Sequence, residues 1–314
     1  MSELRWSAPA QGGLFELGRR VAGKGEYRGL TFHEVEAKSI LNHVPSDRFG
    51  FNWTINPYRG CSHACVYCFA RPTHDYLGFG IGEDFDTQIV VKTNAVELAR
   101  AETSPGRWAG ELIAMGTNTD PYQPAEGKYR LTRGVVEVLV ERSNPFSILT
   151  KSTLALRDLE LFVEAAQRTD VSVNFSIGTL DPEVWKTTEP GTPHPQRRIE
   201  AVAKLTDAGV PSSVLVAPLL PGLSDRPDQI AAVERACREA GAHSVSRIRL
   251  HLRPGVKQHF MGWLALKRPD LVPEYERLYR DRAYLSSPRR RRSPYRQQPK
   301  PPEPKPVQTS LPFA

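Results

Sequence analysis

The sequence predicts an α/β fold in which six strand–helix units form a partial, open (β/α)6 barrel, followed by two C-terminal helices and flanked by disordered tails. Strand-like and helix-like segments alternate between residues 51 and 252, which is typical of a parallel sheet. The 314 residues are also enough to bury the large core of one such domain. We therefore expect a single barrel-like domain with additions at its ends.

The expected strands are short apolar runs, and amphipathic segments lie between them. The strands cover residues 51–56, 111–116, 146–150, 171–177, 213–217 and 245–252. The expected helices cover residues 132–142, 156–168, 196–208 and 228–240. The last two helices stop at Gly209 and Gly241, because glycine readily adopts the left-handed conformation that ends a helix.

Four segments are expected along the chain: a flexible arm, the barrel, a helical extension and a disordered basic, proline-rich tail. They cover residues 1–28, 29–256, 257–285 and 286–314. The arm lacks any hydrophobic period, and the tail holds eight of the 27 prolines, so neither can bury a core.

Two short elements are expected at the start of the barrel, and two helices in the extension. Residues 32–35 fit an edge strand and residues 38–42 a turn of helix. Residues 258–266 and 272–282 fit helices with enough apolar surface, including Phe260, to pack on the barrel.

Composition excludes several classes of protein. No apolar run approaches the roughly 18 residues that span a membrane, and the N-terminus has no apolar signal-peptide core. Four cysteines, three of them clustered, favour a reducing compartment over a disulfide framework. We therefore expect a soluble, cytoplasmic protein.

The net charge of +7 lies mostly in the tail. Residues 286–314 contain seven basic residues and one acid, which leaves the other 285 residues with a net charge of +1. The globular part is therefore nearly neutral, and any electrostatic attraction to nucleic acid is expected from the tail.

The most informative motif is a cysteine loop with the spacing C-x3-C-x2-C, formed by Cys61, Cys65 and Cys68. Three soft sulfurs on one short loop are typical metal ligands. An iron–sulfur cluster held by three thiolates keeps one iron without a protein ligand, which favours a reactive cluster. Zinc bound with His63 as a fourth ligand, and unligated thiols, are the alternatives.

Polar residues follow the expected strands where the reactive groups of a β/α barrel gather, at the carboxyl ends. They are residues 117–120, residues 150–152, Asn174, Ser176, Thr179, His251, Arg253 and Lys257. Their recurrence at successive strand ends favours an active site over a solvated edge.

The cysteine spacing, with Tyr67 before the last cysteine, resembles the signature of the radical S-adenosylmethionine (SAM) superfamily. Residues 116–122, 149–152, 173–177 and 189–198 are similar to its spore photoproduct lyase-like branch. The resemblance implies a TIM-like partial barrel of the radical SAM type and one [4Fe-4S] cluster held by the three cysteines. It also implies reductive cleavage of SAM to a 5′-deoxyadenosyl radical, with flavodoxin or ferredoxin as electron donor.

The same resemblance implies SAM contacts at Tyr67, Thr119, Asp120, Lys151 and Ser176. A lysine suits the carboxylate of SAM, an Asp–Thr pair its amino group, and a serine its ribose. The structural alternatives are a turn residue for Asp120 and a buried strand hydroxyl for Ser176.

One departure limits the analogy. The photoproduct lyases have a hydrogen-donating cysteine where this chain has Thr117, and Cys237 lies within an expected helix, where it is better explained as packing. Thymine photoproduct repair is therefore doubtful, and the sequence identifies no catalytic hydrogen donor.

The loop around residues 188–195 is expected either to gate the substrate or to serve as a proline-stiffened structural loop. Glu189 and His194 are candidates to line the site. Arg197 and Arg198 are candidates to bind anions, although a solvated surface explains them slightly better.

The tail carries two candidate binding motifs. Gln308, Leu311 and Phe313 resemble the peptide by which repair proteins bind the bacterial sliding clamp, and a shorter match at residues 11–15 is better explained by chance. The arginines could bind phosphates, or simply keep the tail soluble; they are Arg289, Arg290, Arg291, Arg292 and Arg296.

The favoured function is a lyase-like radical SAM enzyme for DNA repair or nucleic-acid modification. The rival interpretations are a radical SAM enzyme that acts on tRNA, protein or a small molecule, and a non-catalytic, metal-stabilised clamp adaptor.

Overall fold

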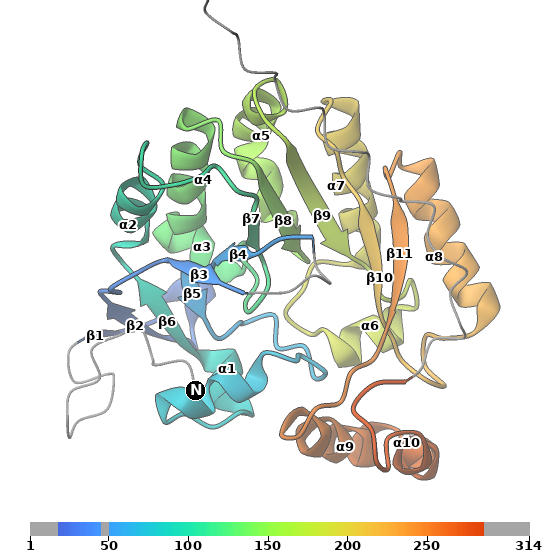
Figure 1. Cartoon of the computed structure of the whole chain (residues 1–314). Coiled ribbons are helices and arrows are strands. Elements are labelled where there is room, and N and C mark those ends of the chain that lie inside the picture. The colour runs from blue at the N-terminus through green and yellow to red at the C-terminus, as the bar shows by residue number, and fades with distance from the viewer. Residues whose placement is uncertain (1–17, 45–49, 286–314) are drawn as a thin grey trace, which may run out of the picture.

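The computed structural model describes residues 18–44 and 50–285, and its main feature is a seven-stranded sheet (Figure 1). Its strand order is β11-β10-β9-β8-β7-β4-β3. Six of these strands are parallel, and each pairs with the next along the chain: β4 (Trp53–Ile55), β7 (Ile113–Met115), β8 (Phe146–Thr150), β9 (Val171–Ser176), β10 (Val214–Leu219) and β11 (Val245–Arg249). The predicted open barrel of six parallel strands is confirmed.

Helices cover the outer face of this sheet (Figure 1). They are α4 (Leu131–Glu141), α5 (Leu159–Ala166), α7 (Pro195–Asp207) and α8 (Pro227–Glu239). Their apolar faces join the inward side chains of the strands in one large core, which includes Cys237 of α8. Packing therefore explains this cysteine, as predicted.

The helix predicted over residues 156–168 has a different start. Residues Thr153–Asp158 form a 3₁₀ helix, and α5 begins only at Leu159. The Ser152 hydroxyl accepts the Leu154 N–H at 3.2 Å, so this side chain begins the tighter turn directly after β8.

A second, four-stranded sheet was not predicted. Its order is β1 (Arg19–Ala22), β2 (Thr31–Val35), β6 (Gln88–Lys92) and β5 (Tyr58–Arg59). The expected strand at residues 32–35 is present as β2, but it lies between β1 and β6 and is not an edge. The flexible arm expected up to residue 28 is wrong from Arg19 onward, because β1 pairs with β2. Residues 1–17 lie outside the described part of the chain.

The turn of helix expected at residues 38–42 is also wrong. β3 (Leu41–His43) is a strand that runs antiparallel to β4. The Glu102 carboxylate accepts the backbone N–H groups of Ile40 and Leu41 at 2.8–3.2 Å, which holds this segment extended. Glu102 ends α2 (Ala95–Glu102), so the conformation depends on a partner about 60 residues away.

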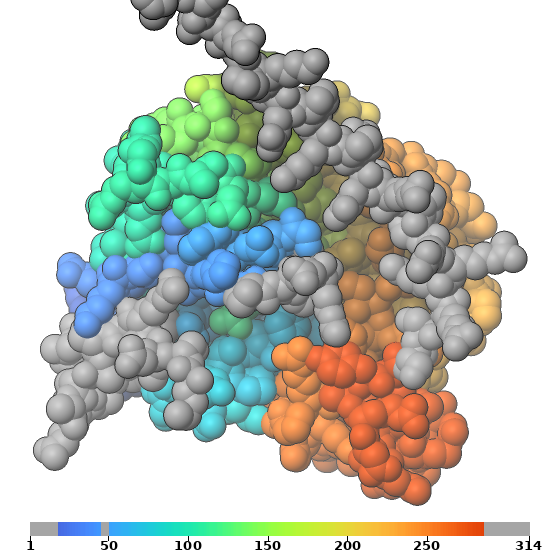
Figure 2. All heavy atoms as spheres, viewed as in Figure 1, coloured from blue at the N-terminus to red at the C-terminus, as the bar shows by residue number. Residues whose placement is uncertain are grey.

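The C-terminal extension folds as predicted into α9 (Val256–Lys267) and α10 (Val272–Leu278), although the second helix ends four residues early. Phe260, Leu264 and Tyr275 share a hydrophobic cluster with Cys65 and Tyr67 of the cysteine loop. Figure 2 shows the extension as a block beside the segment that follows this loop. Within residues 18–44 and 50–285, no helix is long and apolar enough to cross a membrane.

Candidate active site at the strand ends

The cysteine loop follows the short strand β5 and ends at the 3₁₀ turn Arg71–Thr73. Cys61 and Cys65 are buried, Cys68 is half-buried, and none forms a disulfide. Burial raises the pKa of all three thiols, and the charges of Cys65 and Cys68 add to the rise at Cys61. The three thiols therefore lie in surroundings where a thiolate needs a cationic partner.

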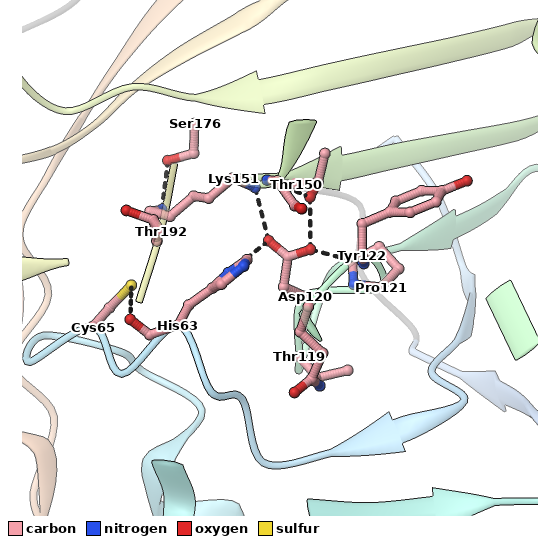
Figure 3. Close-up of polar contacts among 12 residues, drawn as sticks. His63, Cys65, Thr119, Asp120, Pro121, Tyr122, Thr150, Lys151, Ser176 and Thr192 are labelled. Atoms are coloured by element: carbon pink, nitrogen blue, oxygen red, sulfur yellow. Dashed lines mark hydrogen bonds and ion pairs between the residues drawn. The ribbon is translucent and has the colours of Figure 1, made fainter. Parts of the chain in front are cut away.

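This donor set fits an iron–sulfur cluster, because three thiols from one buried loop are the ligands that such a cluster takes. Among residues 18–44 and 50–285, no three His, Cys, Asp or Glu side chains lie close enough to hold a single metal ion. The His63 ring points at Asp120, whereas its backbone carbonyl faces Cys65 (Figure 3). The His63 ring nitrogen is therefore paired with Asp120, which disfavours His63 as a fourth zinc ligand.

Asp120 joins three parts of the site (Figure 3). Its Oδ1 accepts the Thr150 hydroxyl at 2.6 Å and the Tyr122 N–H at 2.9 Å. Its Oδ2 accepts the Lys151 N–H at 2.7 Å and lies 3.2 Å from Nδ1 of His63. Burial raises the pKa of this carboxyl, but His63 and the hydrogen bonds outweigh burial and lower it to about 2.

Lys151 lies between Ser176 and Tyr67 of the cysteine loop. The Lys151 Nζ donates to the Ser176 hydroxyl at 2.8 Å and lies 5.7 Å from the centre of the Tyr67 ring. The Ser176 hydroxyl donates to the Ala217 carbonyl at 2.9 Å. The charge of Lys151 also acts on Cys65, where it opposes the effect of burial on the thiol pKa.

Thr119 and Gln123 both bind the backbone at the start of the cysteine loop, and nothing in the sequence predicts Gln123 there. The Thr119 hydroxyl donates to the Gly60 carbonyl at 2.6 Å. Gln123, fully buried, donates to the same carbonyl and to Thr119 at 2.9 Å, and accepts the Ser62 N–H at 3.2 Å. A glutamine in a turn has no sequence signal for such a role.

Arg71 is a second residue that sequence reasoning missed. It is buried, and its guanidinium donates twice to the Cys65 carbonyl, at 3.0 and 3.1 Å. It also donates to the carbonyls of Ile81 and Gly82 and pairs with Asp86 at 2.8 Å. Its place three residues after the last cysteine was the available signal.

Three residues expected at the strand ends are engaged elsewhere. The Asn174 amide bonds to the hydroxyls of Ser147 and Ser172 within the sheet. His251 forms an isolated bridge with Tyr284, and the Lys257 Nζ donates to the Tyr279 carbonyl at 2.6 Å. The polar end of the sixth strand therefore binds the C-terminal extension.

The loop after α6 (Pro182–Thr188) lies against the cysteine loop. Glu189 is buried, and it accepts the Tyr67 hydroxyl and an Arg198 N–H. The solvated surface expected for Arg198 is wrong, because this side chain is fully buried, whereas Arg197 is exposed. His194 caps α7, since its Nδ1 accepts the Gln196 N–H at 3.2 Å.

Comparisons with known proteins identify a matching family and similar chains. The family model described as Radical SAM superfamily matches residues 55–233. An uncharacterized protein of Mycobacterium tuberculosis is 49% identical over 261 residues, which cover 83% of this chain and 77% of that protein. An uncharacterized protein of Methanocaldococcus jannaschii is 31% identical over 192 residues, which cover 61% of this chain and 69% of that protein.

A solved structure has a similar fold. It is a mutant of spore photoproduct lyase with bound AdoMet and dinucleoside spore photoproduct, with a TM-score of 0.56 and 17% identity. The match covers 80% of this chain and 72% of the lyase chain. At this identity the likeness concerns the fold.

Proposed function

The chain belongs to the radical SAM superfamily, and we propose that it abstracts a hydrogen atom from a nucleic-acid substrate. Membership brings one [4Fe-4S] cluster and SAM as cofactors. When bound, the reduced cluster would supply the one electron that cleaves SAM to a 5′-deoxyadenosyl radical. This radical abstracts hydrogen from unactivated C–H bonds. The chain's own residues position these groups and exclude water.

The observation that carries the proposal is the grouping of Lys151 and Ser176 with Tyr67 of the buried cysteine loop. Cys61, Cys65 and Cys68 would hold the cluster. The Lys151 ammonium would pair with the carboxylate of SAM, and the Ser176 hydroxyl would bind its ribose.

Asp120 is assigned a different part from the direct SAM contact that the sequence suggested. Each oxygen of Asp120 already has two donors, and a carboxylate has about four acceptor positions. The Thr119 hydroxyl donates to the Gly60 carbonyl and accepts from Gln123. This leaves it, like the Ser176 hydroxyl, one acceptor position for SAM. Both residues hold the cysteine loop and the end of β8 in place.

Two features support a nucleic-acid substrate. The fold resembles that of a lyase solved with a dinucleoside spore photoproduct. The chain also ends in a segment with a net charge of +6, as expected of a region that binds phosphates.

Thr117 makes the outcome of the reaction different from photoproduct repair. It follows β7, and its hydroxyl lies 3.4 Å from the Asn56 amide nitrogen at the end of β4. A threonine has no thiol hydrogen to return to a product radical. We therefore favour modification of an intact nucleotide over cleavage of a thymine photoproduct.

The experiment is deuterium transfer from labelled substrates. The anaerobically reconstituted, reduced protein is given SAM with deuterated DNA, deuterated tRNA or a deuterated bacterial protein extract. We expect deuterium in 5′-deoxyadenosine with DNA and an altered nucleoside in the digest. Deuterium transfer from tRNA or protein alone would overturn the choice of DNA, and transfer from protein alone would exclude any nucleic acid.

A further inference from the structure

Arg198 is fully buried, and its whole guanidinium is used inside the protein. Its Nη1 donates to the Ser176 carbonyl at 2.9 Å, and its Nε donates to the Pro193 carbonyl at 3.0 Å. Its Nη2 donates to Glu189 Oε2 at 2.6 Å and to the Thr192 hydroxyl at 2.5 Å. One side chain at the start of α7 therefore contacts both the end of β9 and the loop 188–193.

Glu189 extends this contact to the cysteine loop. Its side chain is 4% exposed, and its other oxygen, Oε1, accepts the Tyr67 hydroxyl. Burial raises the pKa of Glu189, but the charges of Arg198 and Lys151 outweigh burial and keep the carboxyl ionised. An ionised carboxylate can only accept, so the Tyr67 hydroxyl is the donor of this bond.

Backbone contacts run beside these side chains. The Gly191 N–H donates to the His63 carbonyl, and the Val66 N–H donates to the Thr188 carbonyl, both at 3.1 Å. A Cβ at Gly191 would lie only 2.2 Å from the Ser62 carbonyl oxygen. The loop 188–193 is thus packed directly on the cysteine loop, and Arg198 connects this pair of loops to Ser176.

We propose that Glu189, held in place by Arg198, is a positioning residue which, through Tyr67, sets the cysteine loop at a fixed place relative to Ser176. The inference rests on the SAM site proposed above. Cys65 and Cys68 flank Tyr67, so movement of Tyr67 displaces two of the three thiols relative to the strand end that would bind SAM. A buried ion pair adds little net stability, but it can specify one geometry. We assign this role to the pair of Arg198 and Glu189.

The first test needs no cofactor. In the apoprotein, iodoacetamide alkylation of Cys65 and Cys68 is followed by mass spectrometry for the wild type, Tyr67→Phe and Arg197→Met. Tyr67→Phe removes one hydroxyl and leaves the ring, so the fold should survive. We expect alkylation about tenfold faster in Tyr67→Phe, the ratio that a lost hydrogen bond to a charged group carries. Arg197→Met, an exposed change on the same helix, should match the wild type.

The second test separates positioning of the site from support of the fold. The reconstituted variants are assayed for SAM cleavage without nucleic acid, with the KM for SAM and the electron paramagnetic resonance change of the reduced cluster on SAM addition. We expect a KM raised about tenfold and a smaller spectral change in Tyr67→Phe. Because Tyr67 and Glu189 act as one unit, Tyr67→Phe with Glu189→Gln should raise KM no further than Glu189→Gln alone.

The results that overturn the inference are specific. Unchanged alkylation in Tyr67→Phe would show that this chain of contacts does not hold the thiols. Faster alkylation with an unchanged KM for SAM would show that these contacts support the fold and do not set the SAM site. Additive effects of the two substitutions on KM in the double variant would show the same. Because no nucleic acid is present, a wrong substrate assignment leaves these outcomes unaffected.

Discussion

Asp120 shows at the scale of one residue how the site depends on buried charge. Its pKa in the folded protein is about 2, below the ordinary value of about 3.9 for an unfolded chain. A carboxyl group whose pKa is lowered by folding contributes its full stabilisation at pH values above the pKa of the unfolded chain. The contribution is lost as the pH falls through the folded value.

We predict that Asp120→Asn lowers the free energy of unfolding of the apoprotein at pH 7 by about 2–3 kcal/mol, from the shift of roughly two pKa units. The difference from the wild type should shrink as the pH falls from 4 toward 2. Denaturant titrations at several pH values measure both effects. The exposed Asp170→Asn is the control, and a loss that does not vary with pH would contradict the electrostatic explanation.

Arg71 permits a second prediction, because one guanidinium holds a carbonyl of the cysteine loop and a half-buried carboxylate. Burial raises the pKa of Asp86 to about 6 even with Arg71 beside it. Arg71→Met would leave Asp86 and the Cys65 carbonyl without this partner. Denaturant unfolding should show a loss of about 3 kcal/mol, at the low end for broken buried pairs because the Asp86 side chain is 20% exposed.

The control for Arg71 is Arg100→Met, which breaks a surface pair with Glu141 in which both side chains are about half exposed. Surface pairs contribute little, so no measurable change is expected there. Equal losses of unfolding free energy in the two variants would mean that burial does not make the Arg71–Asp86 pair more important for stability than a surface pair.

Individual residues also show where sequence reasoning stops. The three cysteines, Lys151 and Ser176 could be chosen because motif spacing and strand ends identify them. Glu189 could not be read as buried, because the Tyr67 hydroxyl that it accepts is far away in the sequence. Tyr67 lies 122 positions from Glu189. A charged side chain carries no local sign of a distant partner.

At the scale of elements, the contact between the loop 188–193 and the cysteine loop is set by a glycine. Gly191 lies where any Cβ would meet backbone atoms of Ser62 and His63. Backbone cannot move aside as a flexible side chain can, so the two loops would have to separate.

Gly191→Ala should therefore lower the free energy of unfolding by about 1–3 kcal/mol, the range of an overpacked contact, and speed alkylation of the cysteines. Gly262→Ala in α9 is the matched control, because its added Cβ meets nothing within 4 Å. Alanine in a helix is favoured over glycine, so this variant should be as stable as the wild type or up to about 1 kcal/mol more stable. A neutral Gly191→Ala would mean that the loops do not depend on this approach.

The success of the strand prediction and its failures have separate physical causes. The six parallel strands are apolar runs bounded by turns and helices, so local pattern locates them. The second sheet pairs β2 with β6 across more than 50 residues, and β5 has only two residues, which is too short for any period. The strand at Leu41–His43 depends on the distant Glu102 carboxylate, so local pattern there indicated a helix instead.

For the whole molecule, the distribution of charge predicts that DNA binding and SAM cleavage depend on different parts of the chain. Residues 286–314 lie outside the described part of the chain and carry nearly all of the net charge. If they bind phosphates, deleting them should reduce the affinity for DNA and flatten its dependence on salt. The uncoupled cleavage of SAM should stay the same, since the described site uses none of these residues. Fluorescence anisotropy with labelled DNA measures the effect, and unchanged affinity would remove the tail from the proposal.

The extension of α9 and α10 covers one side of the cysteine loop. Its apolar side chains pack with Cys65 and Tyr67, so the cysteine loop is covered on this side. Such cover suits a reactive radical, which must be kept from solvent.

The most direct test of the whole account is the formation of 5′-deoxyadenosine. The protein is reconstituted anaerobically with iron and sulfide, reduced with dithionite, and given SAM, beside variants in which Cys61, Cys65 or Cys68 is alanine. The wild type should be brown, absorb near 400 nm and produce 5′-deoxyadenosine, whereas each cysteine variant should produce none. A colourless wild-type protein that holds zinc and leaves SAM intact would contradict the account.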